Sequence, residues 1–259
     1  MSTKPRECTQ SELEHVRKFV AYAKLRLNAA RYFPPNNAPR YLVALALYSK
    51  SITVAEATLA LVDAGFCDEA FGLTRTLIDL FFTLRYIANK DTEERAKRYS
   101  QFAFKNVEAW SEVIRTYWPQ MARTLDSRTR EIAAKYRSPH QWSGKHVKEM
   151  ALEPDTFEVD PLTGQPAVHD VAYGVFYRWT SHYVHPTISA LENHLVQAGR
   201  DNFEVHSGRN DMTRMAVFNA ASYLTMTMVC FHRCMGDSPP ERVGNWSGAL
   251  IKHLARRHK

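Results

Sequence analysis

Two long apolar segments, separated by only a few residues, constrain what this chain can fold into. Residues 40–64 (RYLVALALYSKSITVAEATLALVDA) and 69–88 (EAFGLTRTLIDLFFTLRYIA) are apolar over most of a helical circumference. Helices of this kind have to be covered on nearly all sides. Gly65 is suited to end the first helix and Asp68 to cap the second, so the connection is short. The sequence therefore predicts a central antiparallel helix pair in an all-α bundle.

Further helices are predicted on both sides of this pair, and no linker divides the chain, so we expect one domain with its core in residues 40–235. The additional predicted helices are one that begins at a capping box (Ser11 to Glu14), one from Thr92 to about Trp118, a basic one to about Tyr136, 171–187, one after Pro186 to about Ala198, Met212–Met235 and a basic C-terminal helix at 245–259. Residues 138–170 contain four prolines and are expected to form an irregular insertion, with a small hairpin from 156–159 and 167–168.

The charge balance favours a polyanionic partner. The chain has 34 Lys and Arg against 27 Asp and Glu, a net charge of +7 with a pI near 9.2. Residues 121–150 contribute seven basic against three acidic side chains. A balance of this kind favours nucleic acid, here RNA, before a membrane surface.

Composition also indicates a compartment. Four cysteines in 259 residues are not a disulfide framework, and the first residues are polar, unlike a signal peptide. The apolar segment 216–231 is interrupted by polar residues and is short for a membrane span. We therefore expect a cytoplasmic protein that does not enter a membrane.

The segment 171–187 (VAYGVFYRWTSHYVHPT) carries the chemistry of most interest. Arg178, His182 and His185 stand at i, i+4 and i+7, so a regular helix places them on one stripe, with Ser181 at its edge. Cleavage of RNA without a metal requires a base for the 2′-hydroxyl, an acid for the 5′-oxygen and a cation on the phosphorane. Two histidines and an arginine provide all three.

Two other interpretations of these residues remain open. In the first, Arg178 pairs with a carboxylate and the histidines form hydrogen bonds inside the core. In the second, His182 and His185 hold a metal ion, with further ligands from Asp79, His169 or Asp170. No HExxH or similar pattern accompanies them, so we expect no metal or other cofactor.

Arg75 and Asp79 are charged residues at i and i+4 on the very apolar second helix of the central pair. A charge in such a helix requires a partner. We expect the two residues to pair with each other. The functional alternative is that Asp79 orients Arg178 or a histidine.

The spacing Arg178-x6-His185 resembles the HEPN superfamily, whose signature is an arginine followed four to six residues later by a histidine. Residues 61–87 and 177–186 (YRWTSHYVHP) also resemble a bacterial helical family of uncharacterised function, with Arg-x3-Glu in a core helix and a Ser…His-Pro segment. The resemblance covers about residues 40 to 200. Asp79 stands where that family has Glu, and Arg200-x5-His206 satisfies the same spacing in a predicted loop.

The HEPN resemblance implies a helical bundle that dimerises across the Arg…His helix. It also implies a metal-independent endoribonuclease of a toxin or antiphage system, for which a neutralising protein partner is possible. Arg178 would bind the scissile phosphate and His185 would act as general acid/base. His182, with a spacing of only three residues, competes with His185 for that role. The alternative is a non-catalytic helical module that binds RNA or a protein.

Overall fold

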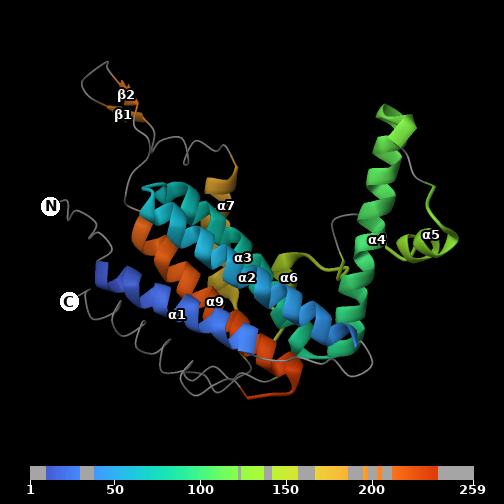
Figure 1. Cartoon of the computed structure of the whole chain (residues 1–259), viewed down its shortest axis with the longest axis horizontal. Coiled ribbons are helices and arrows are strands. Elements are labelled where there is room, and N and C mark those ends of the chain that lie inside the picture. The colour runs from blue at the N-terminus through green and yellow to red at the C-terminus, as the bar shows by residue number, and fades with distance from the viewer. Residues whose placement is uncertain are drawn as a thin grey trace.

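Most of the long helices of this protein lie side by side in a bundle, as the computed structural model in Figure 1 shows. The structure describes residues 10–29, 38–121, 124–136, 142–156, 167–185, 195–197, 203–205 and 212–238. Within these residues the fold is all-α apart from one two-stranded ladder, which confirms the predicted fold class. The elements are α1 (Gln10–Ala29), α2 (Pro39–Asp63), α3 (Cys67–Asn89), α4 (Thr92–Tyr117), the 3₁₀ turn η2 (Pro119–Met121), α5 (Ser127–Ala133), α6 (Val147–Ala151), the π-helix η3 (Ala172–Tyr177), α7 (Arg178–Val184), β1 (Leu195–Gln197), β2 (Phe203–Val205) and α9 (Thr213–Met235).

Three helices, α2, α3 and α9, contact one another along their lengths and form the core. Tyr48 of α2 stacks on Phe231 of α9 with ring centroids 4.5 Å apart. Phe81 of α3 lies 5.9 Å from Tyr223 of α9. The predicted α2–α3 pair is therefore correct, and α9 is the third member that covers it. Gly236 follows α9 with a φ of +77°, a left-handed conformation that ends the helix at small steric cost.

Helix α2 is long and apolar enough to cross a membrane by length and composition. The core helix of a soluble protein has the same properties, and 56% of the apolar window of α2 is buried inside the protein. It contacts α1, α3, α4 and α9. The apolar character of α2 is thus used in helix packing within the bundle.

Helix α4 extends away from the bundle, and α5 packs beside its outer part (Figure 1). Only Arg95 and Ala96, in its first turns, are buried. Asp91 precedes it with a φ of +49°, where the chain turns sharply from α3. The exposed end of α4 presents large apolar side chains, among them Trp110 and Tyr117.

Several predicted details are wrong or lie outside the described residues. Residues 195–197 form β1, which pairs antiparallel with β2, instead of ending a helix. Leu195-Val196 and Phe203 belong to the apolar and β-branched residues that strands favour. Asp68 is a buried first-turn residue of α3, and Phe66 occupies the N-cap position without a side-chain cap. Most of the predicted hairpin at 156–168 and all of the basic helix at 245–259 lie outside the described residues.

The described part of the 138–170 insertion contains α6 and is fastened to α3 by Arg85. This arginine is 1% exposed, donates to the Met150 carbonyl at 2.9 Å, and pairs with Asp155 at 2.7 Å. His169 Nε2 lies 3.2 Å from the other oxygen of Asp155. Because the Asp155 side chain is 0% exposed, its charge depends on these partners.

A second carboxylate, Glu153, strengthens the same attachment. It accepts hydrogen bonds from Asn89 at 2.9 Å, Arg95 at 2.8 Å and Lys145 at 2.9 Å. Burial raises the pKa of Glu153, but these three donors outweigh that effect and lower it to about 2. Glu153 therefore stays ionised at neutral pH and joins α3, α4 and the insertion.

Replacing Asp155 by Ala should destabilise the fold strongly, because it leaves the buried Arg85 charge without its carboxylate. We expect a loss of about 3–5 kcal/mol in the free energy of unfolding, measured by urea titration. Glu112→Ala, at an exposed position on α4, should change it by less than about 0.5 kcal/mol. Similar losses in the two variants would contradict the role assigned to the Arg85–Asp155 pair.

Candidate functional site

Helix α7 is held on α3 by a cluster of polar side chains around Arg75, which we call the Arg75 cluster. Arg75 Nε donates to Ser181 Oγ at 2.9 Å, and its two other nitrogens bind Asp79 and the Tyr177 hydroxyl. Ser181 Oγ donates in turn to the Tyr177 carbonyl at 2.7 Å. The expected pair of Arg75 and Asp79 is present, and its partners on α7 are Tyr177 and Ser181.

Burial shifts the pKa of two ionisable members of this cluster, Arg75 and Tyr177. It lowers the pKa of the Arg75 guanidinium, an effect that Tyr177 and Tyr173 oppose. Burial also raises the pKa of the Tyr177 hydroxyl, against the charge of Arg75. Arg75 remains a cation and Tyr177 a neutral phenol at neutral pH, so the contact is a charge-assisted hydrogen bond.

The packing around the Arg75 cluster is close and aromatic. Phe71 of α3 meets the rings of Trp179 and Tyr183 edge-on, each at 5.0 Å. Gly72 lies opposite Tyr183, and a methyl group there would come within 3.4 Å of the Tyr183 Cβ. The backbones of α3 and α7 therefore lie close together at Gly72.

Arg178, His182 and His185 lie on the other side of α7 and are all exposed. The interpretation that the two histidines are hydrogen-bonded within the core is therefore wrong. Arg178 forms no ion pair or side-chain hydrogen bond with any described residue. The predicted stripe is thus divided: Ser181 faces α3, whereas the arginine and histidines face outward.

His185 departs from the predicted helical stripe. It follows the last residue of α7 with φ −103° and ψ 148°, an extended conformation, although its backbone N–H still bonds to Ser181 O at 3.2 Å. Only Arg178 and His182 are therefore related by one regular helical turn. Of the two candidate histidines, His182 has the better-defined position relative to Arg178.

A π-helix, η3, directly precedes Arg178. The sequence predicted a regular α-helix here, because the prediction assumed 3.6 residues per turn. The wider turns of η3 place Tyr173 and Tyr177 one above the other, with ring centroids 4.9 Å apart and an interplanar angle of 23°. π-turns of this kind occur frequently at functional sites. Here the turn directs Tyr177 to Arg75 and the next residue, Arg178, to solvent.

The residues proposed as additional metal ligands do not gather around the two histidines. Asp79 pairs with Arg75, His169 contacts Asp155, and Asp170 is exposed and binds the backbone N–H of Val171. Across the described segments of the chain, no group of three or more His, Cys, Asp or Glu residues is placed to hold a metal ion. The metal interpretation therefore has no structural support in these segments.

One pocket adjoins the Arg75 cluster, and we call it the Asp79 pocket. It has a volume of about 730 Å³ and lies between α3, α4 and α6. The pocket was not predicted, because its walls come from segments far apart in the sequence. Its lining residues are Asp79, Thr83, Tyr99, Phe102, Ala103, Asn106, Trp142, Lys145, His146, Val147 and Met150.

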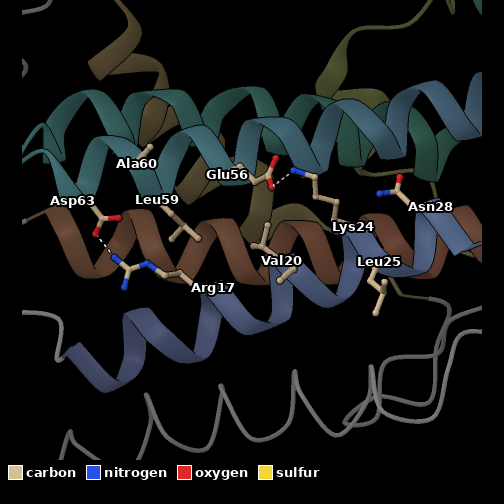
Figure 2. A pocket seen from close by; sticks show the side chains of 10 residues that line it. Arg17, Val20, Lys24, Leu25, Asn28, Glu56, Leu59, Ala60 and Asp63 are labelled. Atoms are coloured by element: carbon tan, nitrogen blue, oxygen red, sulfur yellow. Dashed lines mark hydrogen bonds and ion pairs between the residues drawn. The ribbon is translucent and has the colours of Figure 1, made fainter.

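A second pocket, of about 600 Å³, lies between α1 and α2 and is shown in Figure 2. Two ion pairs cross it, Arg17–Asp63 and Lys24–Glu56. These pairs neutralise its charged lining and connect the two helices. The pocket lacks histidine and is lined by α1 and α2 alone, so we regard it as a seam between packed helices.

Comparison with known proteins places the chain in a family. Residues 41–203, more than half of the chain, match the model of a family of unknown function, DUF5677. The chain belongs to this family. The DUF5677 match begins in α2 and includes both the Arg75 cluster and the Arg178/His182 face. No curated protein and no solved structure matched the chain.

The Arg75 cluster should determine how firmly α7 is attached. Arg75→Ala removes the donor to Ser181 and Tyr177, and we expect a loss of about 1–3 kcal/mol in the free energy of unfolding. In this variant, the backbone amides of α7 should exchange with deuterium faster than in the wild type, and those of α9 should change less. Mass spectrometry measures both rates. The matched control Lys97→Ala lies at an exposed position on α4. Unchanged exchange in α7 would contradict the attachment.

Proposed function

We propose that this protein is a metal-independent endoribonuclease of the HEPN type that works as a homodimer in the cytoplasm. The observation that supports it best is the exposed face of α7, where Arg178 and His182 stand one helical turn apart, with His185 just beyond. A cation and an imidazole at this spacing can engage one phosphodiester.

The proposed reaction is an internal transfer at phosphorus. A histidine removes the proton of the 2′-hydroxyl, whose oxygen attacks the adjacent phosphorus, while the guanidinium of Arg178 stabilises the charge on the phosphorane oxygens. The bond from phosphorus to the 5′-oxygen breaks, and that oxygen takes a proton from a second acid. The products are a 2′,3′-cyclic phosphate and a 5′-hydroxyl.

The apolar side chains beside these groups support dimerisation through α7. Val171 is 61% exposed and Val175 is 49% exposed, on the segment that leads into Arg178. Exposed apolar side chains beside an arginine are common in protein interfaces, whose centres are apolar and in which arginine is enriched. A second copy placed on this face would bring two Arg178/His182 sets to one cleft and would provide the second acid.

The positive charge of the chain supports a polyanionic substrate such as RNA. The chain carries a net charge of +7, and α5 adds Arg128 and Arg130. A role in defence or as a toxin, with a neutralising protein partner, follows from the HEPN resemblance. A module that binds RNA or a protein through the same face, without cleaving RNA, is the alternative.

Cleavage should depend on α7 and not on a metal. The purified protein is incubated with total RNA in EDTA, and the 3′ ends of the products are analysed for cyclic phosphate. We expect His182→Ala to reduce the rate by roughly 10²–10⁴-fold, as loss of a general acid/base does. Arg178→Ala should reduce it as well, because the phosphorane loses its cation.

Matched controls separate the α7 face from general basicity. Arg115→Ala and His15→Ala remove the same residue types from exposed positions on α4 and α1, and should leave the rate unchanged. RNA binding without cleavage in the wild-type protein would favour the non-catalytic module. Equal rates in all variants would remove α7 from the mechanism.

The dimer is tested separately. Val175→Glu places a charge in the proposed interface. We expect the molar mass measured by light scattering to fall from that of a dimer to that of a monomer. The rate of RNA cleavage should fall as well. Val107→Glu, a matched change at another exposed valine on α4, should leave the mass unchanged. A wild-type monomer at all concentrations would contradict dimerisation.

A further inference from the structure

We propose that the Asp79 pocket binds a nucleobase, with guanine preferred over the other bases. The pocket lies outside the exposed Arg178/His182 face and has no part in the cleavage chemistry proposed above. Its volume of about 730 Å³ is within the range of small-molecule sites in proteins. The proposal rests on the shape, charge and hydrogen-bonding groups of its lining.

The apolar part of the lining fits a planar ring. Tyr99, Phe102 and Trp142 provide aromatic walls, and Val147 and Met150 fill the space between them. The ring of Trp142 is fixed edge-on against Tyr99, with centroids 5.0 Å apart, and against Tyr86 at 5.7 Å. Aromatic walls that are already held in position are suited to stacking against a base.

The charged groups of the pocket are already paired, which disfavours a phosphate as its ligand. Lys145 Nζ lies 2.9 Å from Glu153 Oε2, and Asp79 pairs with Arg75. Arg75 and Lys145 are therefore each already engaged by a carboxylate, and the negative charges of Asp79 and Glu153 beside them repel a polyanion. A neutral ligand with a hydrogen-bonding edge matches this lining better than a charged one.

The polar edge of the pocket determines which base is favoured. Asp79 is 41% exposed, and Arg75 occupies only its Oδ2 atom. Its other oxygen can accept a hydrogen bond, and Thr83 and Asn106 line the same pocket. Guanine presents two neighbouring donors, N1–H and the N2 amino group, which the two lone pairs of Asp79 Oδ1 can both accept, whereas uracil presents one N–H between two carbonyls. Asp79 therefore favours guanine.

The base can belong to a free nucleoside or to an unpaired nucleotide of an RNA strand, and both present the same edge. Asp79 also belongs to the Arg75 cluster, so a bound base contacts the group that holds α7. Occupancy of the pocket is thus linked to the position of α7. The binding itself does not require the nuclease activity.

The test measures binding to the full-length protein by isothermal titration calorimetry. The probes are guanosine, adenosine and 2′-O-methyl UUGUU, which cannot be cleaved through a 2′-hydroxyl. Ala103→Trp fills the pocket from an exposed position on α4, and should weaken guanosine or oligonucleotide binding by about tenfold or more, as loss of base stacking does. Thr116→Trp, an exposed position on α4 outside the pocket, is the matched control and should bind as the wild type does.

Asp79→Asn tests the choice of base. Asparagine keeps an oxygen for Arg75 but replaces one acceptor by a donor, so the preference for guanosine over adenosine should fall by about tenfold. Thermal unfolding of each variant confirms that it is folded.

The outcomes identify the source of the base and separate this proposal from the nuclease proposal. Guanosine binding that Ala103→Trp weakens indicates a free nucleoside, and binding of the oligonucleotide alone indicates RNA. Equal affinities in Ala103→Trp and Thr116→Trp, or no binding of any probe, would overturn the pocket. Absent RNA cleavage together with intact guanosine binding by the wild-type protein would reject only the nuclease.

Discussion

The buried pair of Arg85 and Asp155 is the interaction on which the outer part of the structure depends. α3 is otherwise the most thoroughly buried helix of the core, and a guanidinium in it costs free energy unless carboxylate and carbonyl groups surround it. Residues 150–155 provide those groups. The attachment of α6 to the bundle, and with it one wall of the Asp79 pocket, follows from this requirement.

Arg75 repeats the same principle three helical turns earlier on α3. It is partly buried, and its partners Tyr177 and Ser181 come from α7 and the π-helix before it. Arg75 and Arg85, two cations on one apolar helix, thus bind two separate segments that come later in the chain. The segment held by Arg85 forms the pocket, and the one held by Arg75 presents Arg178 and His182 to solvent.

Asp79 connects these two regions. It pairs with Arg75 through Oδ2 and is also one of the residues that line the pocket. A ligand that competes for this carboxylate changes the electrostatic surroundings of Arg75, and therefore its hold on Tyr177. The proposed nuclease face and the proposed base pocket are consequently neighbours in structure, although their residues perform different chemistry.

The sequence alone determined the all-α class, the α2–α3 pair, the extents of α4 and α9, and the Arg75–Asp79 pair, because apolar periodicity and the cost of a buried charge are local properties. It also proposed Arg178, His182 and His185 as site residues, but not which way they face. The tertiary structure decided that, since the π-turn changes the helical register before Arg178 and moves Tyr177 to Arg75. Only the tertiary structure assembled the Asp79 pocket, whose lining runs from Asp79 to Met150, and the Arg85–Asp155 pair. Both join residues that are far apart along the chain, and such contacts have no periodic signal in the sequence.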